Sequence, residues 1–480
     1  MSSNEKMYGI KIEVTANSIA IIWGGELPKS TPPGSLNKDT MKLELSVTRI
    51  FHKVLNKGKK ELLEIFEKND FEVLGNMLFK ILCNEEAVRT FLYERLALIS
   101  RDTTARCRIF LEFDQNAYDL ASLPWEYLRI QGNPEKNITP FFWGAGMDIM
   151  TGIFSQYDLI RYVKPDCPPL EQPVITESQH LSVLLVINNP VDKPVDKTRL
   201  VSCFENIRDK NETFDLYYDE KNLLNPPVDS LKEKLKAYLT TFNGPYVLHF
   251  LGHAEMKKEQ QSVIYFTDKN GNAEEIKSED FAELFDGTDP EFRLPVLIVL
   301  QACESGQVGD KGSGIAFSVA KKGIPAIVAM QNEITEDASE NFIKQFYKYL
   351  LKGDDVARAV TKARTYMAIN YNKDQKKSEE HYSDNTFGAP VVYMSAESPF
   401  NLLPPEQKPQ IKKNKKRCKN CGFIYEDTTL ELCQANGGRC HGQLEPVENE
   451  QVSVKITALS QSKTAKIDIG KDVLRNPSAN

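Results

Sequence analysis

The stretch LPVLIVLQACESG, residues 294–306, places an almost continuously apolar run directly before Cys303 and a turn of small residues. The stretch PYVLHFLGHA, residues 245–254, has the same form and delivers His253, 50 residues before the cysteine. Uninterrupted apolar runs of this length are typical of parallel strands that helices cover on both faces. The pattern therefore predicts a buried parallel sheet whose strand ends carry reactive side chains.

Further strands and helices alternate around these two stretches. LSVLLVINNP (181–190) and IPAIVAM (324–330) have the composition of buried strands. VDSLKEKLKAYLTTF (228–242) and SENFIKQFYKYLLKG (339–353) have apolar residues at helical spacing. Such alternation is typical of α/β proteins. We therefore expect an α/β fold with a mainly parallel sheet flanked by helices.

Composition divides the chain into three parts. Residues 1–170 combine alternating apolar segments with helical ones, which indicates an α/β half-domain. A proline-rich stretch at 165–173 is expected to be a linker, because prolines lack the backbone donors that helices and sheets need. The regular strand and helix alternation occupies 175–403, and a small unit with short strands is predicted over 404–480.

The overall composition is that of a folded protein. The chain has 480 residues, of which 41% are hydrophobic and 26% charged, a length that suits several domains. Lys and Arg total 60 and Asp and Glu 67, and the net charge of −7 argues against a protein dominated by a nucleic-acid surface. No apolar run of membrane-spanning length and no secretory signal is found, and five cysteines are scattered singly. We therefore expect a cytoplasmic protein with reduced thiols.

His253 and Cys303 lie just past the ends of two predicted strands. Side chains beyond the carboxyl ends of parallel strands gather at one edge of the sheet, so the two are expected to meet there. A free thiol is mostly protonated at neutral pH, and a neighbouring imidazole can accept its proton. The pair therefore indicates nucleophilic catalysis, with the backbone N–H groups of Ala254 and Cys303 as candidate oxyanion donors. The alternative for Cys303 is a buried, unreactive thiol, which the glycine-rich loop over 306–314 disfavours.

Several motifs together resemble one protein family. The residues QAC at 301–303 match the start of the caspase signature, which has a histidine about 50 residues upstream, although the following glycine is one position late, at Gly306. HFLGHA, LQACESG, IPAIVAM, NEITEDAS and FGAPVVYM, with LASLPWEYL and DLIRYV in the first part, resemble the CHAT family, caspase-like proteases allied to separase, over about residues 1–400. The resemblance implies a caspase-like fold with a degenerate, inactive N-terminal half. It also implies that Cys303 is the nucleophile and His253 the general base.

Other polar side chains near these strands do not by themselves indicate a catalytic role. His249, four residues before His253 on the same strand face, is interpreted as a packed or hydrogen-bonded histidine. Gln301 is predicted to line the substrate pocket, at the position where one related family that cuts after basic residues has an aspartate. The residue preference at the cleavage site is left open, because an acid could also come from Glu255, Glu304, Glu333 or Asp337.

The remaining four cysteines form a cluster near the C-terminus. Cys418, Cys421, Cys433 and Cys440 have the spacing C-x2-C-x11-C-x6-C, with His441 as an alternative fourth ligand. Four such ligands suit tetrahedral zinc and leave no open position for water. We therefore predict a structural zinc site in a zinc-ribbon-like module, against the alternative of unliganded thiols, and no cofactor for the catalysis itself.

A basic run precedes the cysteine cluster, within residues 408–419. Its charged residues are Lys412, Lys413, Lys415, Lys416 and Arg417. The first interpretation is a solvated linker. The second is a tether to nucleic acid or to an acidic partner surface.

These observations predict a cysteine endopeptidase that cleaves a specific protein substrate by Cys-His nucleophilic catalysis. The family resemblance implies prokaryotic antiviral defence, with a gasdermin-like pore former or a regulatory protein as the substrate and with an activating partner or ligand. The alternative from another class is a non-catalytic CHAT-like scaffold whose zinc module binds nucleic acid or a partner protein. The presence of both His253 and Cys303 beside small residues favours the enzyme.

Overall fold

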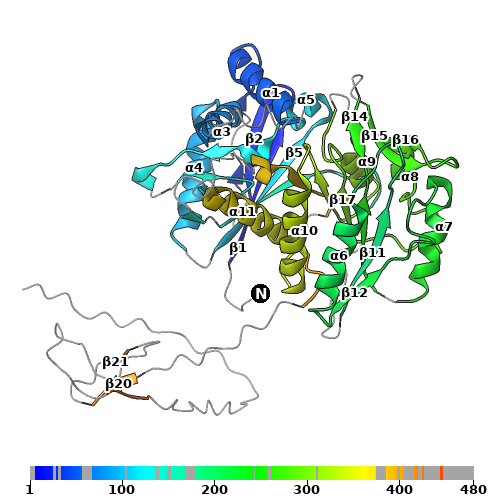
Figure 1. Ribbon diagram of the computed structural model, residues 1–480. Helices are drawn as coiled ribbons and strands as arrows, with labels where there is room; N and C mark the ends of the chain where they lie inside the picture. The colour runs from blue at the N-terminus through cyan, green and yellow to red at the C-terminus, as the bar shows by residue number, and fades with distance from the viewer. Residues whose placement is uncertain are drawn as a thin grey trace, which may run out of the picture. The chain divides into compact units, whose positions relative to one another are not determined.

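Figure 1 shows the chain as a computed structural model, in two units, Met1–Glu406 and Gln407–Asn480. In the first unit the structure describes residues 6–404, without 25–28, 31–33, 57–67, 103–104, 137, 139, 146, 149–152, 155, 169, 171–178, 243, 258–260, 310–311, 375–384 and 397–399. In the second unit it describes residues 416–419, 424–425 and 444–446.

A sheet of twelve strands organises the described part of the first unit. Its order is β12-β11-β13-β17-β18-β19-β10-β5-β1-β2-β3, and β4 also pairs with β2. The strands are β1 (Met7–Val14), β2 (Ser18–Trp23), β3 (Lys29–Ser30), β4 (Gly34–Ser35), β5 (Arg106–Phe113), β10 (Tyr157–Tyr162), β11 (Leu181–Ile187), β12 (Phe214–Tyr217), β13 (Tyr246–Leu251), β17 (Leu297–Gln301), β18 (Ala326–Met330) and β19 (Pro390–Met394).

The sheet is mainly parallel, as predicted. The strands from β12 to β18 are parallel neighbours, and so are β19, β10, β5 and β1. The direction reverses between β18 and β19, where Ala326 pairs with Met394 in antiparallel register, and again from β1 to β2. One sheet thus runs through both predicted α/β parts, and the predicted boundary at 170–175 falls in the segment between β10 and β11.

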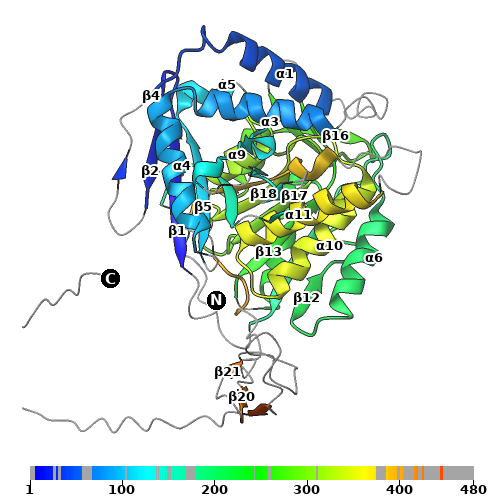
Figure 2. The ribbon, with the colours of Figure 1, turned by 90° about the vertical axis from the view of Figure 1, so that its left-hand side faces the viewer.

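Helices cover both faces of this sheet. They are α1 (Lys42–Asn56), α3 (Lys68–Leu82), α4 (Glu86–Ser100), α5 (Tyr118–Ala121), α6 (Lys197–Arg208), α7 (Val228–Leu239), α8 (Ser278–Glu283), α9 (Ile315–Lys321), α10 (Glu336–Leu351) and α11 (Val356–Asp374), with short 3-10 turns η1 (Gln115–Ala117), η2 (Trp125–Tyr127), η3 (Pro134–Lys136) and η4 (Asn385–Gly388). Figure 2 shows α10 and α11 side by side across one face, in front of β13, β17 and β18.

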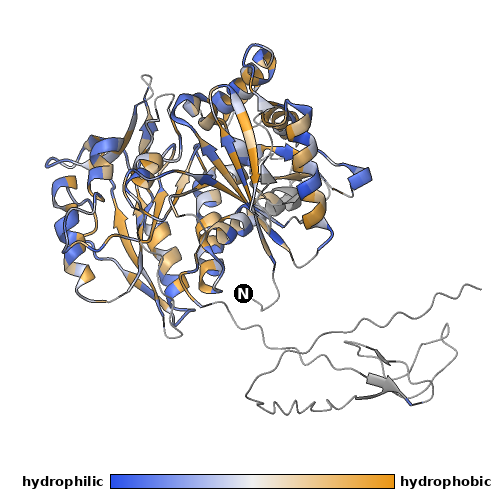
Figure 3. Cartoon of the chain, turned by 180° about the vertical axis from the view of Figure 1, so that it is seen from behind, coloured by the Kyte–Doolittle hydropathy of each residue, from blue (hydrophilic) through white to orange (hydrophobic). Residues whose placement is uncertain are grey.

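The strand β11 shows why its sequence is almost entirely apolar, with the buried Ser182 as its one polar residue. Leu181, Val183 and Leu185 pack in one hydrophobic cluster with α6, α10 and α11, whereas Leu184 and Val186 pack in the other with α7, α8 and α9. Successive side chains of a strand point to opposite faces, so a strand covered on both faces has few polar positions. In Figure 3 the strands of the sheet are accordingly largely orange, and blue residues gather on the outer helices and loops.

The helix α10 begins beside the end of β18 for local reasons. Thr335 caps it, since its Oγ1 accepts the N–H of Ala338 at 3.2 Å, and Glu336 and Asp337 place negative charge in its first turn. Both features stabilise a helix N-terminus. The helix therefore starts at this edge of the sheet and brings its first turns to the cavity described below.

Smaller sheets complete the described structure. The strands β14 (Ala254–Met256), β15 (Ser262–Thr267) and β16 (Ala273–Lys277) form an antiparallel sheet, as do β6 (Arg129–Ile130), β7 (Phe141–Phe142), β8 (Met147–Asp148) and β9 (Ile153–Phe154). In the second unit, β20 (Lys416–Cys418) pairs in antiparallel fashion with β21 (Ile424–Tyr425) and β22 (Leu444–Pro446). Among the helices of the described residues, none has the length and apolar character that a membrane span needs.

Candidate active site

Two neighbouring strands end at the same edge of the sheet. The strands β13 and β17 are parallel partners, and their last residues, Leu251 and Gln301, pair with each other. His253 lies two positions after the end of β13, and Cys303 lies two positions after the end of β17. The parallel register therefore carries both side chains to one edge, as the sequence predicted.

A cavity of about 260 Å³ at this edge is lined by both His253 and Cys303. The remaining lining residues belong to β13, β17, the start of α6 and the start of α10, with their adjoining loops. They are Val195, Asp196, Arg199, Leu200, Leu251, Gly252, Gln301, Ala302, Ile334, Glu336, Ser339 and Glu340. The structure thus brings the predicted nucleophile, the predicted base and the predicted pocket residue Gln301 to one cavity.

One backbone carbonyl orients the ring of His253. The Nε2 atom lies 3.1 Å from the carbonyl oxygen of Pro194. A carbonyl oxygen only accepts hydrogen bonds, so Nε2 carries the hydrogen and Nδ1 of the neutral ring keeps a lone pair. The atom Nδ1 is therefore the proton acceptor that this ring offers.

The surroundings of Cys303 favour the neutral thiol. Burial raises the pKa of Cys303, and the carboxylates of Glu333 and Glu304 raise it further. The backbone N–H groups of Ile334 and of Cys303 itself act in the opposite direction, because they donate to the sulfur. The net effect is a raised pKa, so the thiol needs a base before it can act as a nucleophile.

The turn that follows Cys303 has an unusual backbone. Glu304 has a φ of 59°, in the left-handed region that residues with a side chain rarely adopt. Its carboxylate accepts the backbone N–H of Met256 at 2.7 Å. Met256 belongs to β14, the strand that begins directly after His253. This hydrogen bond therefore connects the turn that contains Cys303 to the strand that follows His253.

Close packing explains why the chain has a glycine at position 306, one position later than in the caspase signature. A Cβ on Gly306 would lie 2.6 Å from Cγ2 of Val391 and 3.1 Å from the backbone carbon of Met330. The N–H of Gly306 donates to the carbonyl of Met330 at 2.8 Å, and Oγ of the buried Ser305 accepts the N–H of Met330 at 3.2 Å. The turn therefore packs directly on β18 and β19, and only glycine fits at 306.

His249 is buried and hydrogen-bonded, as predicted. Its Nδ1 lies 3.0 Å from the hydroxyl of Tyr347, and its Nε2 lies 3.0 Å from Oε1 of Gln301. The Nε2 of Gln301 in turn donates to Oγ of Ser339 at 2.8 Å. Burial lowers the pKa of His249 to about 4, so the ring is neutral at physiological pH. This chain of hydrogen bonds fixes the side chain of Gln301 at the wall of the cavity.

The acids that line the cavity differ from those that the sequence suggested. Glu255 is engaged by Tyr265, whose hydroxyl donates to it at 2.6 Å, and Asp337 forms an ion pair with Arg199. The acids of the cavity are Asp196, Glu336 and Glu340, and Arg199, which pairs with Glu340, is its basic residue. Their one sequence signal is position, since helix starts that follow parallel strands lie at the functional edge of a sheet.

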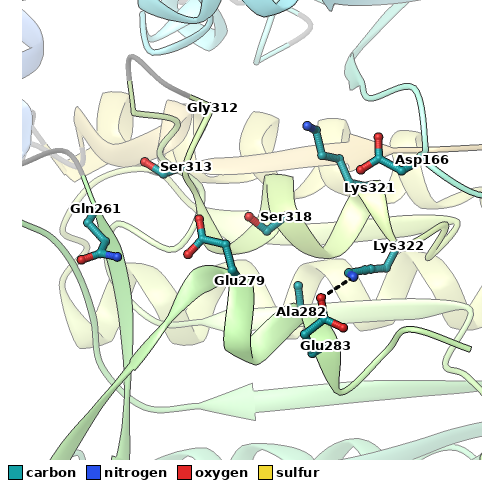
Figure 4. A pocket seen from close by; sticks show the side chains of 10 residues that line it. All are labelled: Asp166, Gln261, Glu279, Ala282, Glu283, Gly312, Ser313, Ser318, Lys321 and Lys322. Atoms are coloured by element: carbon teal, nitrogen blue, oxygen red, sulfur yellow. Dashed lines mark hydrogen bonds and ion pairs between the residues drawn. The ribbon is translucent and has the colours of Figure 1, made fainter. Parts of the chain in front are cut away.

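A larger cavity of about 610 Å³ lies elsewhere in the first unit, between α8, α9 and the loop before α9 (Figure 4). Its charged lining is mixed, with the acids Asp166, Glu279 and Glu283 and the lysines Lys321 and Lys322. The amine of Lys322 binds Glu283 at 2.6 Å. Neither His253 nor Cys303 lines this cavity, so it is not the candidate active site.

The predicted zinc ligands lie at or beyond the limits of the described structure. Cys418 is the last residue of β20, while Cys421, Cys433, Cys440 and the alternative ligand His441 lie outside the described residues. Among the residues that the structure does describe, no group of three or more His, Cys, Asp or Glu could hold a metal ion. The zinc site stays a prediction, as do Ala254 and Cys303 as oxyanion donors.

A family model, the CHAT domain, matches residues 161–403 of this chain. The match spans half of the sequence, and the chain therefore belongs to the CHAT-domain family, as its motifs predicted. A search among curated protein sequences finds no match.

Three solved structures are similar to parts of the chain. Separase from Saccharomyces cerevisiae, in its complex with securin, is 12% identical with a TM-score of 0.40, over 81% of this chain and 30% of that chain. A secreted C11 cysteine protease from Bacteroides thetaiotaomicron is 13% identical with a TM-score of 0.30, over 45% of this chain and 66% of that chain. RgpB from Porphyromonas gingivalis is 10% identical with a TM-score of 0.32, over 63% of this chain and 68% of that chain. The chain thus spans 30% of the separase chain, and these likenesses are too distant to indicate its activity.

The carboxylate of Glu333 should slow the reaction of Cys303 with alkylating agents. We expect Glu333→Gln to raise the rate of alkylation of Cys303 by iodoacetamide at pH 7.5 by about two- to fivefold, because it removes a negative charge that disfavours the thiolate. The curve of rate against pH should move to lower pH. Mass spectrometry of the peptide that contains Cys303 gives the rate. Glu279→Gln, which removes an equal charge at the larger cavity, is the control, and an unchanged rate in Glu333→Gln would show that Glu333 does not contribute to the raised pKa of Cys303.

Proposed function

We propose that this chain is a cysteine endopeptidase in which Cys303 is the nucleophile and His253 is the general base. The observation that carries the proposal is the shared cavity, in which both side chains lie at the ends of neighbouring parallel strands. The hydrogen bond from Nε2 of His253 to Pro194 adds to it, because it leaves Nδ1 as the base. The alternative of a non-catalytic scaffold requires neither feature.

The first half of the proposed reaction forms an acyl-enzyme. Nδ1 of His253 accepts the proton of the Cys303 thiol, and the thiolate attacks the carbonyl carbon of the scissile peptide bond. The carbonyl oxygen becomes an oxyanion, to which the backbone N–H groups of Ala254 and Cys303 donate in this proposal. When the tetrahedral intermediate collapses, the C–N bond breaks and the imidazolium of His253 gives its proton to the leaving amine.

The second half of the reaction releases the enzyme. Nδ1 of His253, again neutral, takes a proton from water, and the resulting hydroxide attacks the thioester carbon. The C–S bond then breaks, and the thiolate of Cys303 recovers its proton from His253. The raised pKa of Cys303 fits this sequence, since it makes the resting enzyme a neutral thiol and leaves activation to the base.

The proposed substrate is a specific protein. We infer from the family resemblance a pore-forming or regulatory protein of prokaryotic defence, and an activating partner or ligand. We also propose that the basic run at 408–419 is a binding site for nucleic acid or for an acidic surface of a partner protein. The zinc module after 404 would then recruit the protein substrate or sense the activating ligand, while the cavity of the first unit would cleave the peptide bond.

The first prediction tests the pair of catalytic residues. We expect Cys303→Ala and His253→Ala each to abolish cleavage of a peptide library and of a candidate protein substrate, because members of one catalytic unit fail together. Cys167→Ala and His180→Ala are matched controls, since both residues are exposed and lie outside the cavity, and they should retain full activity. Equal cleavage by the wild type and Cys303→Ala would contradict the protease proposal and favour the alternative of a non-catalytic scaffold.

The second prediction concerns the wall of the cavity. Gln301→Glu keeps the length of the side chain and adds a charge beside the substrate, so we expect a shift of preference toward Arg or Lys at the cleavage site by about tenfold or more in kcat/KM. Gln115→Glu is the control, because Gln115 is exposed and does not line the cavity. A peptide-library profile that is the same in both variants and the wild type would remove Gln301 from the substrate pocket.

The third prediction concerns the proposed zinc. Thiolate donors fit this ion, and a unit as small as 404–480 gains much of its stability from a metal. We expect elemental analysis to find one zinc per wild-type chain and its loss in Cys418→Ser, with cleavage of short peptides unchanged and cleavage of the protein substrate weakened. Cys167→Ser should keep the metal. Wild-type protein without stoichiometric zinc would contradict the metal site, and loss of peptide cleavage in Cys418→Ser would show that the module takes part in the chemistry.

A further inference from the structure

Among the charged residues of the N-terminal motifs, Glu126 in LASLPWEYL and Arg161 in DLIRYV bind each other. The proposed chemistry gives neither of them a role. Both are buried, with exposed fractions of 1% for Glu126 and 3% for Arg161. They form a two-pronged ion pair, in which Nε of Arg161 donates to Oε1 of Glu126 at 2.9 Å and Nη2 donates to Oε2 at 2.5 Å.

The ion pair is ionised and fully hydrogen-bonded. Burial opposes the charge of Glu126, but Arg161 holds the pKa of this carboxyl below its ordinary value. Further donors of Arg161 reach the carbonyls of Ala121 and Leu123, at 3.0 and 3.2 Å. A buried ion pair adds little net stability compared with apolar residues of equal volume, because both ions lose their hydration. The ion pair of Glu126 and Arg161 therefore matters for the groups that it holds in place rather than for its net stabilisation of the fold.

Arg161 is connected through Tyr393 to the turn that contains Cys303. Its Nη1 donates to the hydroxyl of Tyr393 at 3.3 Å, and that hydroxyl donates to the carbonyl of Gly306 at 2.7 Å. Gly306 is the last residue of the turn that starts at Cys303. Tyr393 is buried, which raises its pKa and keeps the hydroxyl a donor. The neighbouring strands β10 and β19 pair Arg161 directly with Tyr393.

A second contact holds the other side of the same turn. Gln331 follows β18, and its Oε1 accepts Nη2 of Arg161 at 2.9 Å while its Nε2 donates to Oε2 of Glu126 at 2.8 Å. The preceding residue, Met330, accepts the N–H of Gly306 through its carbonyl at 2.8 Å. Both the N–H and the carbonyl of Gly306 are thus bound by groups that the ion pair of Glu126 and Arg161 fixes.

We propose that Arg161 is a positioning residue for Cys303, which it holds through Tyr393 and the carbonyl of Gly306. The N-terminal part thereby contributes to the chemistry without reaching the substrate. The proposal rests on the proposed function of Cys303. It assigns a role to the WEYL and DLIRYV motifs, which supply the ion pair.

The physical reason is the strain in the turn. Glu304 has a left-handed backbone, and such a conformation persists only where its surroundings hold it. If the carbonyl of Gly306 loses its donor, the peptide group after it can rotate and the turn can relax. The sulfur of Cys303 would then shift relative to Nδ1 of His253, and misplacement of a reacting group by about 1 Å can cost a factor of about 100 in rate.

The test compares two variants that remove one buried hydroxyl each. Tyr393→Phe deletes the donor to Gly306, and Tyr246→Phe deletes a hydroxyl that donates to the carbonyl of Arg293 at 2.8 Å. Both tyrosines are buried, and Tyr246 opens β13 at the end opposite to His253. The thermal midpoint, kcat, KM and the rate of alkylation of Cys303 from pH 6 to 10 are measured for both variants and the wild type.

We expect Tyr393→Phe to lower kcat by about tenfold or more with KM nearly unchanged, because the substrate cavity is intact while the nucleophile is misplaced. Its alkylation curve should also differ from that of the wild type. Tyr246→Phe should lower the thermal midpoint to a similar extent and leave kcat and the alkylation curve at wild-type values. If the two variants have the same kcat and the same alkylation curve, the positioning role of Arg161 is wrong.

The alkylation curve separates this proposal from the proposed function. If the wild type cleaves no more than Cys303→Ala, the protease proposal fails, yet a curve altered in Tyr393→Phe alone still supports the positioning of the thiol. If the wild type is a protease and Tyr393→Phe has full activity, only the positioning role fails. Arg161→Lys is a second variant, since it keeps the charge beside Glu126 but loses the planar guanidinium that reaches Tyr393 and Gln331 together. We expect it to lower kcat as Tyr393→Phe does.

Discussion

The ion pair between Glu126 and Arg161 connects the N-terminal part of the first unit to the strands beside the candidate site. Both charges are buried next to the pairing of β10 with β19, and removing one partner of a buried ion pair costs about 3–5 kcal/mol. The buried Arg364, 3.9 Å from Oε1 of Glu126, is a second cation beside the same carboxylate. The guanidinium also binds backbone carbonyls at Ala121 and Leu123, which fixes the segment before Glu126. The strands of the N-terminal part are therefore held in register with those that carry the site.

The register of the sheet has a chemical consequence at its far strands. Because β13 and β17 are parallel and adjacent, the predicted base His253 and the predicted nucleophile Cys303 follow their two strands at the same edge without a long loop. This placement also buries Cys303, which raises the pKa of the thiol. In the proposed mechanism, activation of the thiol therefore depends on His253 and on the N–H groups of Ile334 and Cys303 rather than on a preformed thiolate.

Sequence patterns predicted the strands and the residues at their ends, because apolar runs and parallel order place side chains without further information. They could not show the reversal between β18 and β19, since PVVYM is as apolar as β17, which is parallel to β18, and periodicity carries no direction. The partners of Arg161 could not be predicted either, because Glu126 and Tyr393 are 35 and 232 residues away and hydrogen bonds at such separations leave no local pattern. The acids of the cavity, Asp196, Glu336 and Glu340, have only their position near helix starts as a sequence signal, and that signal does not show which side chains face the cavity.

The turn CESG shows how one residue can serve two requirements that conflict. A left-handed backbone at 304 would suit glycine, and a glutamate there costs on the order of 1–3 kcal/mol. Its carboxylate, however, binds the N–H of Met256 at 2.7 Å, and a hydrogen bond to a charged group is worth about 1.5–3 kcal/mol, which offsets most of the strain. The same charge raises the pKa of Cys303. Glu304 thus makes the thiol less acidic, and its hydrogen bond connects the turn after Cys303 to the strand after His253. Since β13 and β17 already lie side by side, this bond adds a direct link between the segments that follow their two strand ends.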